Sequence, residues 1–224
     1  TSGIDSAAVW IADYMKRAGL EPGGDDGTYF QTFEVTTGIE VLAPCAIEVD
    51  GAMHDRGEQF QPIGFSTNGR LVAPIVFAGY GITAPGFDYD DYAGLDARDK
   101  IVLVLSKEPG EMDSTNRFDG DINTDFAELR TKAITAREHG ALGMLVVDGP
   151  IYHEGAPVRR PQLRGTGYMT SGLVAGRISQ QIADALLQRA GTSLADAQRA
   201  IDAETRPNSM AIPGSLVVSV TLRR

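Results

Sequence analysis

The chain has 224 residues and a formal net charge of -10 at pH 7, from 30 acidic and 20 basic side chains. This length predicts one large domain, or one domain with a short additional piece. Because nucleic-acid binding requires clustered Lys and Arg side chains, the acidic balance argues against DNA or RNA as a partner. The composition, 42% hydrophobic and 22% charged, is typical of a globular protein. No apolar run approaches the roughly 20 residues that a membrane span needs.

The first segment has the apolar spacing of a helix, with Asp5 placed to cap its start and Gly19 to end it. Apolar side chains recur there at intervals of three and four residues, at Ile4, Ala8, Ile11, Met15 and Ala18. A Gly/Pro/Asp-rich turn at 22–26 separates this helix from the rest of the chain. Because the helix has one apolar stripe, we expect that stripe to need a partner surface.

From residue 29 to about residue 77, the sequence pattern is that of short strands joined by turns. Asp50-Gly51 and Asn68-Gly69 are typical of hairpin turns. Pro74 predicts an edge or bulged strand, because proline cannot donate a hydrogen bond to a ladder. We expect an antiparallel sheet built from strands at 29–35, 39–43, 45–49 and 71–78.

The second half alternates strands with helices. Continuous apolar runs at 101–105 and 144–147 predict strands buried on both faces. The helix between them is predicted to start at a capping box of Asp125 and Glu128 and to end at Gly140. Two further helices at 179–190 and 193–203 and a closing strand at 216–222 complete an α/β (α+β) pattern.

Three histidines and one cysteine offer little catalytic chemistry. A zinc site needs about three converging ligands, and neither His54, His139 nor His153 lies in a ligand-type spacing. His139 falls instead in a last helical turn, where the helix dipole favours a cation. Cys45 lies in an alternating apolar run, which predicts a small core residue. Since no Gly-x-Ser-x-Gly elbow occurs either, we expect neither a zinc site nor a nucleophile.

Residues 79–84 fit the G-x-G-x-x-A fingerprint of dinucleotide-binding folds. That fingerprint requires a helix to begin at the glycines, so that its N-terminus can hold a pyrophosphate. Pro85 and Gly86 come directly after it. We therefore expect no dinucleotide site here.

An acidic loop presents alternating oxygen ligands at Asp119, Asp121 and Asn123. This alternation resembles a calcium loop, but Thr124 stands where an EF-hand has glycine and Arg130 where it has glutamate. The loop is thus a calcium candidate with an incomplete ligand set, and the alternative is a solvated loop. Charge is also uneven further on, where Arg159, Arg160, Arg164, Arg177 and Arg189 outnumber acidic residues, a pattern typical of a solvated face.

Three runs carry a resemblance to a known family: VFAGYGI at 76–82, YDDYAGLD at 89–96 and KIVLVL at 100–105. They resemble the protease-associated (PA) domain carried by zinc aminopeptidases of the two-metal type. The segment 136–147 is similar to the same family's helix followed by a strand. The resemblance covers most of residues 40–222 and implies a β-rich PA-type sandwich or barrel with flanking helices, preceded by an N-terminal helix.

The opening residues resemble the start of the peptidase domain into which such a PA module is inserted. The resemblance therefore implies two parts, residues 1–35 as the start of a peptidase domain and 36–224 as the PA-like domain. The family's metal ligands lie beyond the insertion, so we expect no catalytic residue and no cofactor in this chain. Zinc is expected only in the absent catalytic part.

The resemblance implies structural roles for six residues, Gly79, Tyr80, Gly81, Asp90, Asp91 and Tyr92. If the module binds peptide, the expected surface is the segment 109–124, with contacts from Asp113, Arg117 and Phe118. The implied function is a non-catalytic module that mediates protein or peptide interaction, or gates substrate access to a peptidase active site. The implied location is secreted or in the cell envelope or periplasm.

Two alternatives stay open. The chain could be a stand-alone metal-dependent hydrolase that uses the acidic loop with His153 and Glu154 as general acid and base. It could also be an independent peptide- or glycan-binding module. Under the resemblance, the partners are a peptide or protein substrate, or the peptidase domain. The apolar stripe of the N-terminal helix adds self-association as a further expectation.

Overall fold

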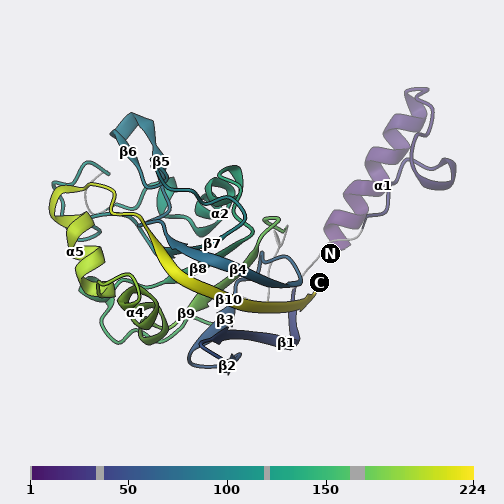
Figure 1. The fold of residues 1–224 in the computed structure, drawn as a ribbon. Coiled ribbons are helices and arrows are strands. Elements are labelled where there is room, and N and C mark those ends of the chain that lie inside the picture. The colour runs from purple at the N-terminus through teal and green to yellow at the C-terminus, as the bar shows by residue number, and fades with distance from the viewer. Residues whose placement is uncertain (1, 34–37, 119–121, 162–169) are drawn as a thin grey trace. The chain divides into compact units, whose positions relative to one another are not determined.

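The computed structural model describes residues 2–33, 38–118, 122–161 and 170–224. The chain divides into two compact units, Thr1–Thr36 and Thr37–Arg224. Figure 1 shows a helical first unit and a second unit in which helices pack on a central sheet. No helix in these described ranges combines the length and the hydrophobicity that crossing a bilayer requires.

The first unit consists of helix α1 (Ser2–Arg17) and a turn that folds back after it. The predicted helix is confirmed, and Gly19 follows it with φ of +75°. The predicted strand at 29–35 is wrong for residues 29–33, while 34–35 lie outside the described residues. The chain curls there instead, because the Asp25 N–H bonds to the Phe30 carbonyl at 2.7 Å and the Tyr29 hydroxyl to the Leu20 carbonyl at 2.5 Å.

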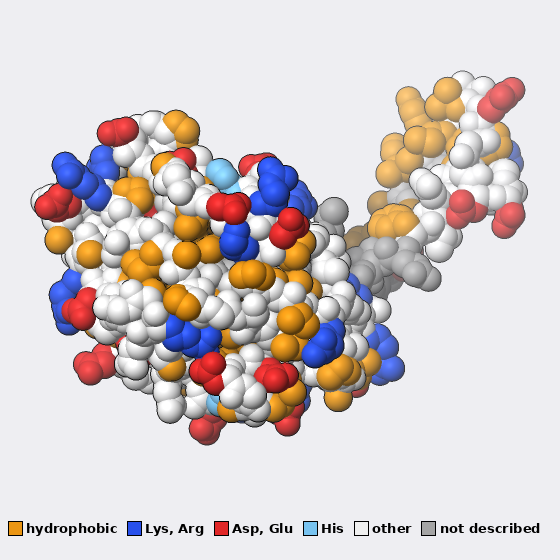
Figure 2. All heavy atoms as spheres, in the orientation of Figure 1, with side chains coloured by type: hydrophobic (Ala, Val, Ile, Leu, Met, Phe, Trp, Pro, Cys, Tyr) orange, Lys and Arg blue, Asp and Glu red, His pale blue; other side chains and the backbone are white. Residues whose placement is uncertain are grey.

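Helix α1 exposes its apolar side chains within this unit, as the space-filling view shows (Figure 2). The Trp10 ring is 62% exposed and stacks on the Tyr14 ring at 5.7 Å between centroids. The other exposed apolar side chains of the helix are Ile4, Val9, Ile11 and Met15. The stripe predicted from the sequence is thus present, and nothing among the described residues of the first unit covers it.

The second unit is built on a mixed eight-stranded sheet in the order β2-β1-β10-β4-β7-β8-β9-β3 (Figure 1). Its strands are β1 (Glu40–Val49), β2 (Ala52–Asp55), β3 (Phe60–Pro62), β4 (Gly69–Phe77), β7 (Ile101–Leu105), β8 (Gly143–Val147), β9 (Val174–Ile178) and β10 (Met210–Arg223). A separate two-stranded ribbon pairs β5 (Thr83–Ala84) with β6 (Tyr89–Asp90). Strands β4, β7, β8 and β9 are parallel, and the other pairs of the large sheet are antiparallel.

Helices cover both faces of the parallel strands. They are α2 (Leu129–Glu138), α3 (Pro150–His153), α4 (Gln180–Gln188) and α5 (Leu194–Glu204). Because successive side chains of a strand point to opposite faces, Ile101, Leu103 and Leu105 pack in one apolar cluster with α4 and α5. Val102 and Val104 pack in a second cluster with Ala133 and Ala136 of α2. All five residues of β7 and all five of β8 are buried, which confirms the prediction of strands covered on both sides.

The predicted turns have mixed outcomes. Asp50 and Gly51, with φ of +51° and +78°, join β1 to β2 as a hairpin and confirm that prediction. The hairpin predicted at Asn68-Gly69 is wrong, because β3 and β4 pair with different strands. Asn68 instead uses its side-chain amide, which accepts from the N–H of Leu222 at 2.7 Å and donates to the carbonyl of the same residue at 2.9 Å.

Pro74 lies in β4, an interior strand, so its prediction as an edge residue is wrong. It is confirmed as a bulge residue: the register of β10 shifts between Ile212 and Ser215, and Ser215 lies opposite Pro74. The parallel pairing with β7 starts only at Ile75. The missing N–H of the proline therefore falls where the ladder is already interrupted.

Serine side chains cap the starts of α4 and α5, whereas the predicted start of α2 is not observed. The hydroxyls of Ser179 and Ser193 accept from backbone N–H groups at the starts of α4 and α5, at 3.2 and 3.0 Å. The capping box of Asp125 and Glu128 is wrong. Asp125 belongs to a separate 3-10 turn capped by Thr124, and α2 begins only after Glu128, whose backbone is extended.

The single cysteine lies in β1 within the main apolar cluster and is 7% exposed. Burial raises the pKa of the Cys45 thiol to about 11. The prediction of a small core residue is confirmed.

Candidate functional site

Asp91 is the centre of a fully buried hydrogen-bonded cluster that follows β4. Its Oδ2 accepts from the N–H groups of Tyr80 at 3.0 Å and Ile82 at 3.1 Å. Its Oδ1 accepts from the Tyr89 hydroxyl at 2.8 Å. Oδ2 thus binds the backbone of the Gly79–Ile82 turn, and Oδ1 binds the side chain of Tyr89 in β6. We call this arrangement the Asp91 cluster.

Two positions of the turn require glycine. Gly79 has φ of +48°, and a Cβ added there would lie 2.1 Å from the Asp91 Oδ1. Gly81 has φ of +70°, and its Cβ would lie 2.7 Å from the Cγ1 of Val104. The left-handed backbone and the close approach act together, because both exclude a side chain. The G-Y-G spacing read from the sequence is therefore a packing requirement.

A buried lysine from α2 completes the Asp91 cluster. The Lys132 Nζ donates to the carbonyl of Tyr80, and its side chain is 1% exposed. Burial raises the pKa of Asp91 to about 7, and burial lowers the pKa of Lys132 to about 7, each opposed in part by the charge of the other. The pair joins α2 to the turn from inside the protein.

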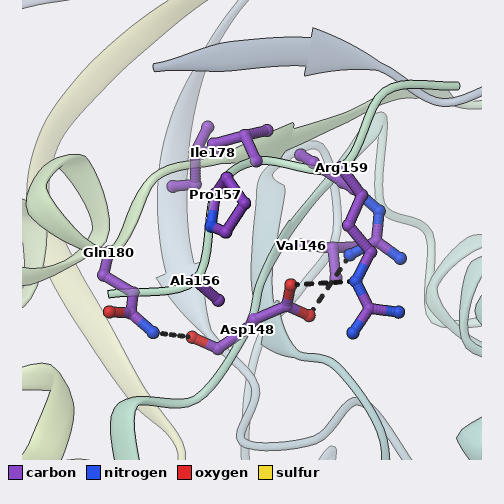
Figure 3. Close-up of a pocket in the computed structure, with 9 residues that line it drawn as sticks. Val146, Asp148, Ala156, Pro157, Arg159, Ile178 and Gln180 are labelled. Atoms are coloured by element: carbon purple, nitrogen blue, oxygen red, sulfur yellow. Dashed lines mark hydrogen bonds and ion pairs between the residues drawn. The ribbon is translucent and has the colours of Figure 1, made fainter. Parts of the chain in front are cut away.

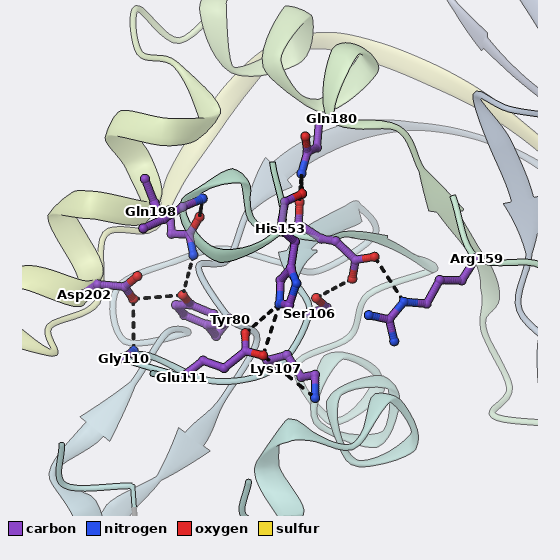
Figure 4. A network of polar contacts seen from close by, with 12 residues as sticks. Tyr80, Ser106, Lys107, Gly110, Glu111, His153, Arg159, Gln180, Gln198 and Asp202 are labelled. Atoms are coloured by element: carbon purple, nitrogen blue, oxygen red, sulfur yellow. Dashed lines mark hydrogen bonds and ion pairs between the residues drawn. The ribbon is translucent and has the colours of Figure 1, made fainter. Parts of the chain in front are cut away.

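Tyr80 links the Asp91 cluster to α5. Its hydroxyl donates to Asp202 Oδ1 at 2.8 Å and accepts from Gln198 Nε2 at 3.1 Å, as Figure 4 shows. The same Asp202 oxygen accepts from the N–H of Gly110 at 3.2 Å. Burial raises the pKa of Asp202. These contacts fix the start of the 109–118 segment.

The remaining residues of the predicted motif lie in the same region. Asp90 Oδ1 accepts from the Tyr92 N–H at 3.0 Å and the Thr83 hydroxyl at 2.7 Å. The Tyr92 ring stacks on His139, which is the C-cap of α2, with centroids 4.2 Å apart. The structure thus brings together the six motif residues, Gly79, Tyr80, Gly81, Asp90, Asp91 and Tyr92, in contacts that build the fold.

The predicted peptide-contact segment is divided between surface and core. Asp113 and Arg117 are exposed, and Asp113 accepts from the N–H and the hydroxyl of Thr115 at 2.8 and 2.6 Å, which lowers the pKa of its carboxyl. Phe118 is not a surface contact, because its ring is fully buried and stacks on Phe87 at 5.0 Å. An aromatic side chain in that segment therefore anchors it to the core.

The calcium candidate lies mostly outside the described residues, to which Asp119 and Asp121 do not belong; Asn123 is exposed. Within the described ranges, no group of three or more His, Cys, Asp and Glu side chains could hold a metal ion. His153 does not pair with Glu154, which is exposed. Its Nε2 lies 2.8 Å from Glu111 Oε2.

A second polar cluster, which the sequence reasoning missed, lies where β7 and β8 end. Ser106 and Asp148 directly follow these strands, and the Ser106 hydroxyl donates to Asp148 Oδ1 at 2.6 Å. Arg177 Nη1 lies 3.3 Å from Oδ1, and Arg159 Nε lies 3.4 Å from Oδ2 (Figure 3). We call Ser106, Asp148, Arg159 and Arg177 the Asp148 cluster.

A second layer of contacts supports the Asp148 cluster (Figure 4). Gln180 Nε2 at the start of α4 donates to the carbonyls of Asp148 at 2.9 Å and His153 at 2.7 Å. Glu111 holds His153 and lies 4.0 Å from the Lys107 Nζ. Segments from four parts of the chain therefore meet at the carboxyl edge of the parallel strands.

A pocket of about 150 Å³ opens beside the Asp148 cluster, and its lining includes Ser106, Lys107, Glu128, Asp148, Arg159 and Arg177. Asp148 is 8% exposed and Arg177 15%, whereas Arg159 is 54% exposed. Burial lowers the pKa of the Arg177 guanidinium below its ordinary value. The arrangement supplies several N–H donors to a small pocket, which suits recognition of an oxygen anion.

A signal for this second cluster was present in the sequence. Ser106 and Asp148 stand immediately after the two predicted buried strands, and ligands of open α/β sheets bind at the carboxyl ends of parallel strands. Arg159 and Arg177 carried no such signal, because only the folded chain brings them to Asp148.

No protein-family model and no curated protein matches the sequence. Among solved structures, the chain is similar to an aminopeptidase from Aneurinibacillus sp. strain AM-1, with 19% identity and a TM-score of 0.49 over 85% of this chain and 34% of that one. It is also similar to BSAP, a zinc aminopeptidase from Bacillus subtilis, with 16% identity and a TM-score of 0.45 over 100% of this chain and 38% of that one.

A third similar structure is Apa1, a psychrophilic subtilisin-like protease from the Antarctic psychrotroph Pseudoalteromonas sp. AS-11. Here the identity is 13% and the TM-score 0.41, over 84% of this chain and 34% of that one. The chain thus spans little more than a third of the length of each of these proteins. These values describe a partial likeness of fold.

Proposed function

We propose that residues 36–224 form a non-catalytic protease-associated module of a larger zinc-dependent, aminopeptidase-like peptidase. In this proposal, the module binds peptide or protein segments, or controls their access to an active site elsewhere in the parent protein. The parent protein is secreted or resides in the cell envelope. Residues 1–35 belong to the start of the peptidase domain.

The observation that carries the proposal is the Asp91 cluster. The sequence resemblance depends on 79–82 and 89–92. In this region the Asp90 and Asp91 carboxylates accept hydrogen bonds from backbone N–H groups and hydroxyls of the region itself. Carboxylates whose acceptor sites are filled in this way hold the local fold together. The residues that carry the resemblance therefore have structural roles, as expected of an accessory domain.

The polar groups near the pocket also lack the arrangement of a catalytic site. Ser106 donates to a carboxylate that two arginines hold, and in the described chain no hydrogen bond joins Ser106 to His153. A serine nucleophile requires a base that can take its proton, typically a histidine within hydrogen-bond reach. The Asp148 cluster is therefore better suited to binding than to acyl transfer.

Zinc does not fit the described residues. A zinc site takes three or four His, Cys, Asp or Glu ligands that converge on one point, and the described ranges contain no such group. The pairing of His153 with Glu111 supplies two side chains with Lys107 as the neighbour, and a lysine ammonium repels a metal cation. We therefore assign zinc to the parent protein's catalytic part and derive no step through it here.

The first test is hydrolysis of an aminoacyl p-nitroanilide by the purified chain, with and without added zinc. We expect no release of p-nitroaniline above that of a mock preparation from cells lacking the gene. Turnover that exceeds the mock preparation and follows the protein through two unrelated chromatography steps would overturn the proposal.

The alternative of a metal-dependent hydrolase is tested by metal analysis of the same preparation and by Asp121→Ala. A stoichiometric transition metal that is lost in the variant would favour the hydrolase over the accessory module. Calcium alone would indicate a structural loop and leave the proposal standing.

A further inference from the structure

We infer that the pocket beside the Asp148 cluster binds a peptide carboxylate, held by the guanidinium groups of Arg159 and Arg177. The inference deepens the proposed function by naming the charge of the bound group, and it rests on that function only in taking the ligand to be a peptide. The shared chemistry is a single carboxylate, from either a chain terminus or an Asp or Glu side chain.

Unused donors are the first argument. A guanidinium presents five N–H groups in a planar fork. Arg159 and Arg177 each place one nitrogen on Asp148, at 3.4 and 3.3 Å, and within the described chain neither makes another hydrogen bond or ion pair. Most donors of two arginines thus stay available at the pocket, which is more than a purely internal ion pair requires.

The charge of the lining is the second argument. Three cations, Lys107, Arg159 and Arg177, face two carboxylates, Asp148 and Glu128. The ionisable side chains that line the pocket therefore carry one net positive charge, and Glu111, which lies 4.0 Å from the Lys107 Nζ, is outside that lining. A singly charged carboxylate neutralises this excess, whereas a phosphate dianion would leave a net negative site. Bidentate pairing with a planar carboxylate is also the geometry that a guanidinium favours.

The size of the pocket is the third argument. Its volume of about 150 Å³ equals roughly five water molecules at their share of about 30 Å³ each in the liquid. That space holds a carboxylate and a small neighbouring group, but not a folded partner. The site would thus read the end of a peptide, or one acidic side chain, while the rest of the ligand lies outside.

The Asp148 carboxylate is expected to weaken the binding of a peptide carboxylate at the pocket. Asp148 pairs with one nitrogen of Arg159 and one of Arg177. Its carboxylate therefore competes with the carboxylate of a bound peptide for the guanidinium donors. Replacing Asp148 by asparagine would keep the shape and the acceptor oxygen for Ser106 while removing the competing charge. Binding should become severalfold tighter, a result that a merely structural ion-pair network would not produce.

The test is isothermal titration calorimetry of the full chain at low salt with four probes. These are N-acetyl-Ala-Ala with a free carboxylate, its C-terminal amide, N-acetyl-Glu-Ala-amide and inorganic phosphate. We expect saturable binding of at least one carboxylate peptide and none of the uncharged amide. The first and third probes distinguish a terminal carboxylate from an acidic side chain, and either result supports the inference.

Variants separate specific recognition from general charge. Arg159→Gln should weaken binding about tenfold, as expected for loss of charge-assisted hydrogen bonds. The matched control is Arg206→Gln, because Arg206 is 76% exposed and pairs with Glu204 at 3.3 Å away from the pocket lining. It should change the affinity less than twofold. Because Arg159 is itself half exposed, Arg159→Gln should keep the circular dichroism spectrum of the parent chain.

Several outcomes would overturn the inference. They are equal binding of the amide, tighter binding of phosphate than of every peptide, an equal loss in Arg159→Gln and Arg206→Gln, and no saturable binding by any probe. Failure here is distinguishable from failure of the proposed function. The hydrolysis test measures turnover and does not depend on Arg159.

Discussion

Two buried carboxylates of the second unit, Asp91 and Asp148, have opposite surroundings. Asp91 is fully buried and accepts from two backbone N–H groups and a tyrosine hydroxyl, each of which has no further use. Asp148 is 8% exposed and is held by two arginines that keep most of their donors beside a pocket. The comparison shows that a saturated polar cluster specifies a fold, whereas one with spare donors retains the capacity to bind.

The largest expected effect comes from Gly79→Ala, which breaks the saturated cluster. The added Cβ would lie 2.1 Å from Asp91 Oδ1 at a left-handed backbone position. Because strain and loss of the Asp91 contacts combine, we expect the free energy of unfolding to fall by at least about 3 kcal/mol. Urea denaturation followed by circular dichroism measures this change.

Gly86→Ala is the matched control for that variant. An added Cβ at Gly86 would meet nothing within 4 Å, and its φ is not left-handed. We expect a change below about 0.5 kcal/mol. Equal losses in the two variants would show that Gly79 is not required by the Asp91 cluster.

The pH dependence of stability gives the second effect. The folded-state pKa of Asp91 is raised by burial from 3.8 to about 7, so its contribution is fully present below pH 3.8 and is lost as the pH rises through about 7. Compared with Asp91→Asn, the parent chain should therefore lose stability between pH 4 and pH 7. The expected slope is on the order of 1 kcal/mol per pH unit. Parallel stability curves for the two proteins would contradict this assignment.

Ser106→Ala tests the other carboxylate and should have a smaller effect. It removes the 2.6 Å hydrogen bond to Asp148 but leaves both arginines in place. We expect a loss of about 1 kcal/mol in urea denaturation. Ser215→Ala, at an exposed position of β10, should stay within about 0.5 kcal/mol of the parent chain. A loss above about 3 kcal/mol in Ser106→Ala would mean that the Asp148 cluster is as saturated as the Asp91 cluster.

The smallest effect concerns the first unit. Its helix exposes Trp10 and other apolar side chains, so we expect the full chain to self-associate weakly with rising concentration. Multi-angle light scattering should show a mass increase that is absent from a version beginning at Thr37 and reduced in Trp10→Lys. Identical monomeric masses at all concentrations would remove self-association as a role of α1.

The sequence allowed much of the architecture to be predicted, because local signals dominate there. The buried strands at 101–105 and 144–147 and the helices predicted at 179–190 and 193–203 follow directly from residue type and period. The hairpin predicted at Asn68-Gly69 is wrong because the Asn68 side chain bonds to the backbone of Leu222, which is 154 residues away in the chain. Such a partner leaves no trace in the local pattern.

The candidate site could be predicted only in part for the same reason. The G-Y-G motif at 79–81 and the D-D-Y motif at 90–92 lie about ten residues apart in the chain. The family resemblance could therefore place both motifs in one cluster. Arg159 and Arg177 reach Asp148 from different segments, and nothing near them in sequence distinguishes them from solvated arginines. Phe118 was predicted as a surface contact and is buried. An aromatic side chain in a polar segment is the one that packs into the core.

The buried thiol in β1 has a practical consequence for all of these measurements. With a pKa of about 11 and 7% exposure, Cys45 contributes almost no thiolate at neutral pH and resists alkylation. A second cysteine introduced at an exposed position such as Asp113 would react alone with a maleimide fluorophore. Site-specific labelling therefore needs no prior removal of the native sulfur, and the β1 packing around it stays intact.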